Sequence, residues 1–532
     1  MKSKKVFCNT GILRSDFRRL WWAPVLMTLL EFLVHPMELI NAYHFDGYSP
    51  DRLYNDLAVV YFVYPILVGA LLFRYLHTSK SIQFFHTLPV TRGQLFRTKI
   101  LTFWMFILIP VLVNWGSMLL IYPTAPYSLR AITPWEIHEL YLTILCGQAA
   151  MCGFTLFAVT ITGNTAGMIL GTIALPFLPL VLFILTTGLL EFTLIGYTAS
   201  DENFLTYLIP FIRDDIEYMR VYLTEWLVLQ ILASIFYRNY KAEATGDLIT
   251  VKWLRPIFLY GVCYCSTILG IAYAFNYEFG LAGYLISSFV ATFIGFAVAE
   301  SLLQRTIRII GSWKKLLCYL VISFAVIIAL KFDVIGYESN IPELSEVESV
   351  QFSYQKSLSD DYYGTRGGAI LTEPENIQKV IEFHQQAAKK ETDSRYWSRY
   401  LIYQLKDGSQ LKRHYSVPND KEIADIINTE EYKRKYYPIF DMEDFLIVSA
   451  NISETMTENS FTLYDIELCK QLEEAVKKDL LEQDVTETTT FHINFEYSRR
   501  ELETEINPSN SYDITNGTHV KAFLEKYKSN QE

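Results

Sequence analysis

The sequence lacks the motifs with which proteins bind and hydrolyse nucleotides. Its 532 residues contain no GxxxxGK(S/T) phosphate loop, no glycine-rich dinucleotide turn and no kinase signature. Basic residues are not in excess either, because the formal net charge is −11, and nucleic-acid binding needs a basic surface. We therefore predict that the chain is not an enzyme, holds no cofactor or metal of its own and binds no nucleic acid.

Cysteine is scarce where a disulfide would matter. Of the seven cysteines, only Cys469 lies in the polar C-terminal part, so that part cannot close an internal disulfide. Cys263 and Cys265 are two positions apart, which is not the spacing of a zinc site. We expect the cysteines to be packing residues.

Long apolar runs are abundant. Hydrophobic residues make up 51% of the chain, and a helix needs about 20 apolar residues to cross a bilayer. Nine segments reach that length with uncertain ends: 21–39, 57–76, 100–122, 140–162, 166–190, 220–237, 256–275, 281–303 and 316–332. The segment 191–219 is also too apolar for a solvated loop and indicates an outer re-entrant element, which protein or water must cover.

Charge in the short loops predicts the orientation. With the N-terminus inside, inner segments collect about 19 basic residues and outer loops about 4, the bias expected of a membrane protein. Nine crossings then place the C-terminal part outside the cell membrane. That part is acidic, with roughly 37 acidic and 22 basic residues. The part before it has roughly 20 acidic and 24 basic residues.

Apolar periodicity in the C-terminal part alternates between strands and helices. We predict strands at 347–354, 445–452, 489–497 and 502–506, a hairpin at 401–417 around the Asp407-Gly408 turn, and helices at 374–390, 421–433, 466–481 and 519–526. The order recurs, which indicates two similar halves of about 90 residues. The predicted fold class is a polytopic α-helical membrane protein of about nine transmembrane helices with a C-terminal soluble α+β domain, built as a tandem duplication.

The predicted domains follow from these segments. They are an amphipathic N-terminal helix in 1–20, a six-helix permease core in 21–237, additional transmembrane helices 7–9 in 238–336, and the extracytoplasmic domain in 337–532. Within the N-terminal helix, Ile12, Leu13 and Phe17 share one face, as in an interfacial helix. The alternative for this helix is a plain basic anchor that fixes the orientation.

Ionisable groups inside the spans are few. The intramembrane polar candidates are Glu31, Glu225 and Glu300. Such groups mark proton or ion pathways in gradient-driven carriers. The alternative for Glu31 is a structural hydrogen bond to a neighbouring span, and Glu225 and Glu300 lie close enough to predicted span ends to reach interfacial water.

The inner loop 77–99 is both basic and aromatic, with the sequence HTSKSIQFFHTLPVTRGQLFRTK. One interpretation is docking of a separate motor protein, and the other is anchoring to anionic lipids, which attract basic residues with about 1 kcal/mol per charge. The stretch SIQFFHTLPVTRGQLFRTK followed by a span resembles the first cytoplasmic loop of type-2 ABC exporter permeases (ABC-2 type) of Gram-positive bacteria. The resemblance covers about residues 1–330, and the three extra spans and the C-terminal domain of unknown function set this chain apart.

The resemblance implies partners and site residues. Permeases of this type dimerise, as homo- or heterodimers, and bind two ABC ATPase subunits that carry ATP and Mg²⁺. It implies a connecting helix at 12–20 and a coupling helix at 81–97. The implied docking residues are Ile82, Phe84, Phe85, Leu88, Arg92, Phe96 and Arg97.

The function expected from the sequence is a permease subunit in a bacterial cell membrane. It would export an amphipathic, peptide or lipid-linked compound, or act in envelope or antimicrobial defence. The alternatives are a membrane-anchored envelope sensor whose outer domain binds a cell-wall ligand or peptide, and a gradient-driven carrier.

Overall fold

The computed structural model describes residues 8–42, 57–124, 133–199, 203–211, 216–356, 367–389, 397–417, 419–442, 445–455, 460–499 and 509–529. The chain divides into two compact units. We call Met1–Leu189 with Ser200–Ala325 the membrane unit, and Leu190–Ala199 with Val326–Glu532 the C-terminal unit.

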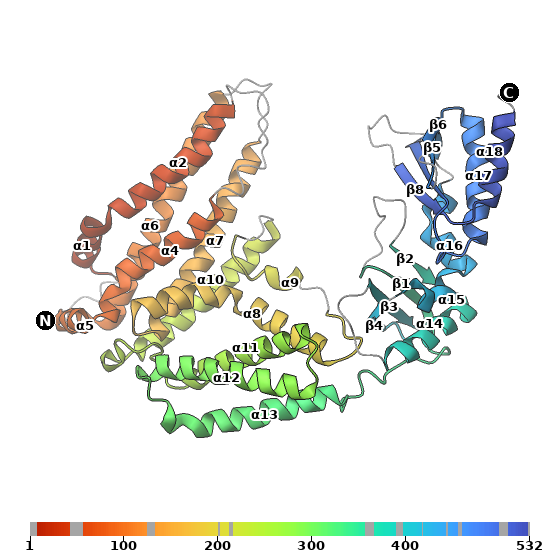
Figure 1. Cartoon of the computed structure of the whole chain (residues 1–532). Helices are drawn as coiled ribbons and strands as arrows, with labels where there is room; N and C mark the ends of the chain where they lie inside the picture. The colour runs from red at the N-terminus through yellow and green to blue at the C-terminus, as the bar shows by residue number, and fades with distance from the viewer. Residues whose placement is uncertain are drawn as a thin grey trace. The chain divides into compact units, whose positions relative to one another are not determined.

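The membrane unit is helical. Within the described residues, nine helices are long and apolar enough to cross a membrane, which confirms the predicted polytopic fold. They are α2 (Trp22–Ala42), α4 (Ala58–Phe73), α6 (Arg92–Ile121), α7 (Pro134–Ile161), α8 (Thr165–Thr193), α10 (Ile216–Arg238), α11 (Leu254–Asn276), α12 (Leu281–Gln304) and α13 (Trp313–Lys331). The helices α11, α12 and α13 pack side by side (Figure 1).

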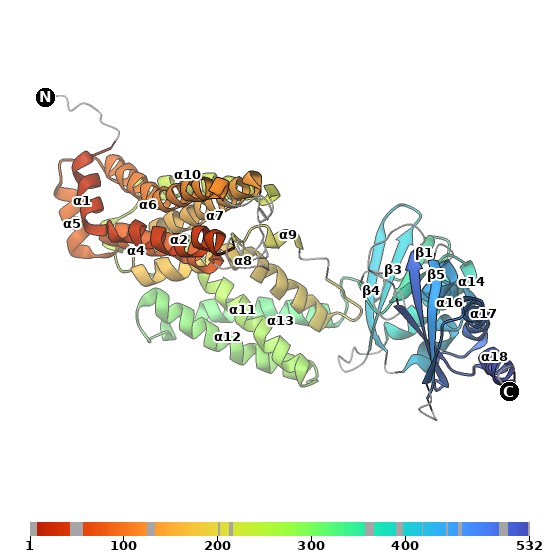
Figure 2. The ribbon, with the colours of Figure 1, turned by 90° about the horizontal axis from the view of Figure 1, so that it is seen from above.

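Shorter helices flank the spans. They are α1 (Thr10–Leu20), α5 (Ser79–Thr87), α9 (Asn203–Thr206) and the 3-10 helices η1 (Arg74–His77) and η4 (Ala242–Ala244). The helices α1 and α5 lie next to each other at one end of the membrane unit, beside the start of α6 (Figure 2). Local sequence defines the helix starts, as at α7, where Thr133 and Glu136 form a capping box.

The loops that we predict on the inner side of the membrane are in contact with one another. The hydroxyl of Tyr240, after α10, donates to the carbonyl of Leu76 in η1 at 3.1 Å. The amide of Thr250 donates to the carbonyl of Ile161 at the end of α7 at 2.8 Å. Asp247 pairs with Arg305, after α12, at 2.7 Å. The helix ends before and after these loops therefore meet at one end of the bundle, as an alternating up-and-down path requires.

The C-terminal unit contains two antiparallel sheets with the same strand order. The first half has β1 (Val347–Ser353), β2 (Gly368–Leu371), α14 (Pro374–Ala387), β3 (Trp397–Leu405), β4 (Gln410–Val417), η6 (Asp420–Ile423), α15 (Ala424–Ile427) and α16 (Glu430–Tyr436). The second half has η7 (Pro438–Asp441), β5 (Phe445–Glu454), β6 (Ser460–Leu463), α17 (Ile466–Glu482), β7 (Phe491–Arg499), β8 (Ser509–Ile514) and α18 (Thr518–Ser529). The strand orders are β2-β1-β3-β4 and β6-β5-β7-β8, so the α+β prediction is confirmed and the topology repeats.

The irregularities of the two sheets repeat as well. In the first sheet the register shifts between Val347 and Ser349, and in the second between Ile447 and Ser449. Each half has its own hydrophobic core between one sheet face and its helices. A shared topology with a shared bulge position is what a tandem duplication produces.

Several predicted elements differ from the structure. The helix expected over 421–433 is divided into η6, α15 and α16, because Thr429 leaves the helical conformation to cap α16. The strand expected at 502–506 lies outside the described residues, and β8 forms after it. The short strands β2 and β6 were not predicted because four residues carry too little periodicity.

The segment after α8 belongs to the C-terminal unit and not to the permease core as predicted. The amide of Ile195 donates to the carboxylate of Glu338 at 2.7 Å, and the amide of His414 donates to the carbonyl of Gly196 at 3.1 Å. Because β4 is an edge strand, this segment covers part of an otherwise open edge. The predicted re-entrant segment 191–219 is thus split, and only its part beyond 199 belongs to the membrane unit.

Candidate functional site

The predicted coupling stretch folds into two helices rather than one. The helix α5 ends at Thr87, and the extended backbone of the next residue, Leu88 (ψ 144°), is favoured by the following Pro89. The span α6 then starts at Arg92, capped by the hydroxyl of Thr91. The single helix over 81–97 that the resemblance implies is therefore corrected, because its second half is the first turn of a membrane span.

The predicted docking residues differ in exposure. Phe84 is 62% exposed, whereas Ile82 and Phe96 are buried, at 1% and 4%. Arg92 and Arg97 are exposed, and Phe85 and Leu88 are half-buried. The buried members hold α5 in place, and Phe84 is the large apolar side chain that α5 presents at the surface.

Lys99 joins the N-terminal helix and α5 to the third span. Its Nζ lies 2.8 Å from the carboxylate of Asp16 in α1. The same Nζ lies 5.2 Å from the ring centre of Phe85 in α5, within cation–π distance. The Lys99 side chain is 1% exposed, so it is a buried ion-pair partner and not one of the surface charges of the loop.

The helix α1 forms where the amphipathic pattern predicted it. Asn9 caps it, and the backbone amide of Asn9 donates to the Thr98 hydroxyl at 2.9 Å. The Phe17 ring meets Phe106 edge-on at 4.9 Å, and Ile12 packs against the same core. Leu13 is half-buried. The role of these residues as a connecting helix stays a prediction.

A second set of contacts ties the α5 region to α10. The Phe96 ring stacks on Tyr237 near the end of α10, with ring centres 4.0 Å apart. The hydroxyls of Tyr237 and Tyr75 are 3.3 Å apart. Arg92 donates to the carbonyl of Tyr240 at 3.2 Å. These contacts join η1 and α6 to the end of α10, and the Tyr75 ring also meets Phe85 of α5 at 4.8 Å.

The first intramembrane candidate, Glu31, is fully buried and hydrogen-bonded to two other spans. Its carboxylate accepts from the Tyr61 hydroxyl of α4 at 3.1 Å and from the Asn114 amide of α6 at 3.0 Å. His35 lies 3.4 Å from the same Tyr61 hydroxyl. These contacts agree with the structural alternative for Glu31, in which hydrogen bonds to its carboxylate join α2 to α4 and α6.

The second candidate, Glu300, joins α12 to α13. Its carboxylate accepts from Ser312 at 2.5 Å, from Gln304 at 2.6 Å and from Lys315 at 2.8 Å. The residue is 1% exposed. One oxygen of Glu300 accepts hydrogen bonds from all three donors, so this residue links α12 to α13 at the end of a span.

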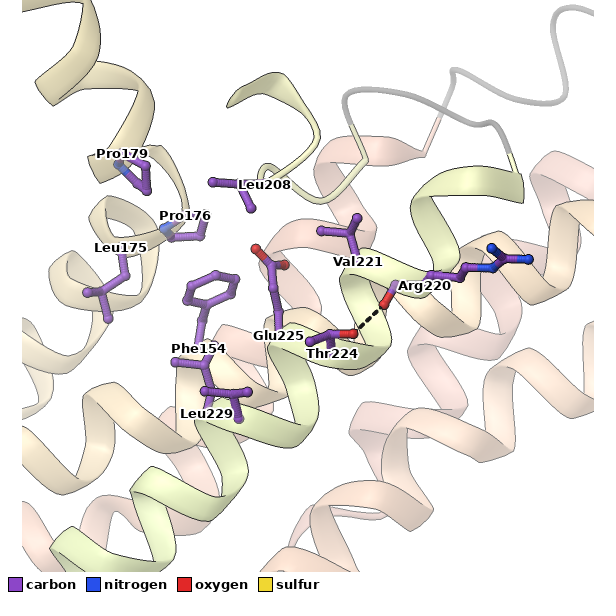
Figure 3. A pocket seen from close by; sticks show the side chains of 11 residues that line it. Phe154, Leu175, Pro176, Pro179, Leu208, Arg220, Val221, Thr224, Glu225 and Leu229 are labelled. Atoms are coloured by element: carbon purple, nitrogen blue, oxygen red, sulfur yellow. Dashed lines mark hydrogen bonds between the residues drawn. The ribbon is translucent and has the colours of Figure 1, made fainter. Parts of the chain in front are cut away.

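The third candidate, Glu225, faces a cavity. A cavity of about 490 Å³ lies between α7, α8 and α10, and Leu208 near α9 also lines it. Figure 3 shows the Glu225 carboxylate pointing toward Leu208 and Pro176, whereas Arg220 points away. The buried Oε2 of Glu225 has no hydrogen-bond partner among the described residues. A solitary carboxyl in an otherwise apolar space is an arrangement for binding one polar group of an amphipathic molecule.

Sequence reasoning missed two of the residues that organise these sites. Asp16 follows Ile12 by four positions and precedes Leu20 by four, so it lies on the apolar face of α1, and that placement was a usable signal. Asn114 is a lone amide within an apolar span, and such residues usually bond a neighbouring helix. Neither signal identifies its partner.

The chain is similar to a protein of Bacillus subtilis (strain 168) named "Probable ABC transporter permease YtrD". The two are 22% identical over 330 residues, which cover 57% of this chain and 99% of the relative. No family model matches the chain, and no solved structure matches it. Together with the candidate spans of the described residues, this distant similarity supports a multi-pass membrane permease of an ABC transporter, and it implies ABC ATPase partners in general.

Proposed function

We propose that the chain is the permease subunit of an ATP-driven exporter of the ABC-2 type, and that separate ATPase subunits drive it through α5. The observation that carries the proposal is the construction of α5. Its surface presents Phe84, whereas Phe85 on the same helix meets the buried Lys99 of α6. A force applied to α5 is passed to the spans, because close-packed side chains transmit displacement.

The helix α10 carries that displacement toward the cavity. Tyr237, on which Phe96 stacks, and Glu225, which lines the cavity, lie on the same helix. Twelve residues of α-helix separate them by about 18 Å. A tilt of α10 that begins at α5 therefore changes the width of the cavity between α8 and α10.

The cargo that fits this cavity is amphipathic. Most lining side chains are apolar, among them Phe154, Leu175 and Val228, and Glu225 supplies one acceptor. A peptide or a lipid-linked compound with an apolar body and a hydrogen-bond donor satisfies both features. Export of such a compound is consistent with a role in envelope or antimicrobial defence.

The remaining parts of the proposal concern partners and orientation. ATP and Mg²⁺ are held by the ATPase subunits, and a second permease, identical or different, completes the transporter. The N-terminus faces the cytoplasm of a bacterial cell, and the C-terminal unit is extracytoplasmic. The charge bias of the loops supports this orientation.

The test is co-purification with ABC ATPase subunits from host membranes, using Phe84→Ala. Ile307→Ala is the matched control, because Ile307 is 91% exposed in the loop between α12 and α13, at the end of the bundle where the inner loops meet. We expect Phe84→Ala to lose the ATPase and Ile307→Ala to keep it, with both variants inserted in the membrane. ATP turnover of the purified wild-type complex should rise with cargo.

Three results would contradict the proposal in different ways. Retention of the ATPase by Phe84→Ala leaves lipid anchoring as the role of α5. Transport by the purified chain in vesicles with a proton gradient and no ATPase identifies a gradient-driven carrier. A ligand-dependent signal without transport identifies an envelope sensor.

A further inference from the structure

The C-terminal unit contains a cavity of about 680 Å³ between its two halves. The first half contributes the end of β1 and the helices α15 and α16, and the second contributes β7, β8 and the segment before β7. The volume is within the range of about 300–1,000 Å³ that small-ligand sites occupy. None of the residues discussed for coupling or cargo lines it.

One wall of the cavity consists of tyrosines. Tyr432 and Tyr436 stack with ring centres 5.3 Å apart, and the Tyr437 ring meets Tyr436 at 5.0 Å. Tyr354 completes this tyrosine wall, and the guanidinium of Arg399 lies 3.6 Å from its ring centre. Arg399 is held by Asp420 at 2.5 Å. The aromatic surface is therefore preformed by contacts within the protein.

One hydroxyl of this wall is without a partner among the described residues. Tyr432 is 3% exposed, and its buried hydroxyl makes no hydrogen bond. An unpaired buried hydroxyl costs about 1–3 kcal/mol of stability. Because this hydroxyl makes no hydrogen bond, ring packing holds Tyr432 in the tyrosine wall.

A second wall of the cavity carries hydrogen-bonding groups. Gln483 is 4% exposed, and its Oε1 accepts from the Thr515 amide at 2.9 Å. The Nδ1 of His492 lies 2.7 Å from the Asp513 carboxylate. Thr489 and Ser511 add hydroxyls. This wall, the polar wall, offers donors and acceptors at several fixed points.

We propose that this cavity binds a neutral saccharide. The CH-rich face of a sugar ring packs on aromatic rings, which carry a negative face. The sugar hydroxyls, each both donor and acceptor, match the amide, hydroxyl and carboxylate groups of the polar wall.

Other ligand classes fit less well. The described lining has no lysine or arginine, so a phosphate or carboxylate group finds no cationic partner. An organic cation would seek a free carboxylate, but the Asp513 carboxylate of the lining is already paired with His492 at 2.7 Å. An entirely apolar ligand would cover the hydroxyls of Thr489 and Ser511 without offering them a hydrogen bond.

The test uses the purified full chain in lipid nanodiscs on a printed glycan array that carries neutral, anionic and cationic saccharides. We expect binding to neutral glycans, with affinity lowered about tenfold by Tyr436→Ala. Tyr464→Ala is the matched control, because Tyr464 is 75% exposed on the turn before α17 and does not line the cavity. Ser511→Trp keeps the tyrosine wall and fills the cavity, so it should abolish binding.

Three outcomes would overturn the proposal. They are binding to no neutral glycan, a preference for anionic or cationic glycans, and neutral binding that survives both Tyr436→Ala and Ser511→Trp. The melting temperature of each variant identifies misfolding, and Ser511→Trp decides the result where Tyr436→Ala is unstable. The proposal is independent of ATPase docking, because no cavity residue belongs to α5 or α1.

Discussion

The Nζ of Lys99 and the carboxylate of Asp16 form an ion pair with a distance of 2.8 Å to each oxygen, and both side chains are almost fully buried. The two residues are 83 positions apart. The pair joins α1 to α6, and the Phe85 ring 5.2 Å from the same Nζ adds α5, so the three helices are connected at the point on which the proposed coupling depends.

Removing one partner of this pair should destabilise the membrane unit. In Asp16→Asn or Lys99→Met, one buried charge loses its partner, and we expect a loss of about 3–5 kcal/mol in the free energy of unfolding. The double variant should recover much of the loss, because no unpaired charge remains. Thermal unfolding of the purified protein measures both.

Arg19→Met is the control for that experiment. Arg19 also lies near Asp16, at 3.9 Å, but its side chain is 56% exposed. Exposed pairs contribute about 0–1 kcal/mol. If Arg19→Met and Lys99→Met lower the free energy of unfolding equally, burial does not make the Lys99–Asp16 pair more stabilising than an exposed pair.

Glu225 and Glu31 should respond oppositely to replacement by leucine. Glu225→Leu removes a buried oxygen that lacks a partner, so the free energy of unfolding should hold or rise. Glu31→Leu removes the acceptor of the Tyr61 hydroxyl and should cost about 1–3 kcal/mol, whereas the Asn114 amide keeps its bonds to the carbonyls of Thr28 and Pro110. Melting temperatures in the same detergent compare the two.

Cargo stimulation of ATP turnover tests the proposed role of Glu225. Glu225→Leu removes the acceptor that the cargo cavity offers, and should abolish cargo stimulation of ATP turnover in the intact complex. Normal stimulation in Glu225→Leu would exclude this carboxyl from cargo binding.

Gly196→Ala should release the segment after α8 from the C-terminal unit. Gly196 has φ +78°, and an added Cβ would lie 2.6 Å from the Tyr415 hydroxyl. We expect the loss of the bond from the His414 amide to the Gly196 carbonyl and faster hydrogen exchange of that amide. Gly261→Ala is the control, since α11 has open space there and alanine favours helix. Unchanged exchange at His414 in Gly196→Ala would contradict the assignment.

Acid should destabilise the C-terminal unit through His384. Burial, with a smaller effect of nearby Arg413, lowers the pKa of His384 from 6.5 to about 4. The unfolded chain therefore binds more protons than the folded one between these values, and stability rises with pH there. The free energy of unfolding should be full above about pH 6.5 and should fall as the pH drops toward 4.

The variant His384→Phe tests this assignment. It keeps an aromatic ring beside Tyr403, whose hydroxyl lies 3.2 Å from Nδ1, and it removes the titration. The pH dependence between 6.5 and 4 should become shallower. Gln385→Phe, an exposed change on the same helix, should leave the slope as in the wild type, and an equal effect of both variants would assign the slope to other groups.

Local patterns predicted most of the architecture. The hairpin around Asp407-Gly408 forms between β3 and β4, because an Asp-Gly turn and alternating residues act over a few positions. The nine candidate spans among the described residues are those that apolar length predicts. Leu88-Pro89 marks the end of α5 in the sequence, because the residue before a proline is disfavoured in a helix.

The candidate site was predicted less completely. Phe84 is exposed as a docking residue must be, yet Ile82 and Phe96 are buried. A short amphipathic helix does not reveal from its sequence which apolar residues face a partner and which face its own core. That distinction depends on Tyr237 and Phe106, which lie on other helices.

The sequence by itself determined the number of spans, the α+β class of the C-terminal unit and the recurrence of its elements, because apolar length and periodicity are properties of neighbouring residues. Only the tertiary structure decided that Lys99 meets Asp16, that Glu31 is hydrogen-bonded to two spans while Glu225 faces a cavity, and that the tyrosine wall and Gln483 line one cavity. These pairings join residues far apart in the chain. Their partners are selected by the packing of whole helices and sheets, which no local pattern records.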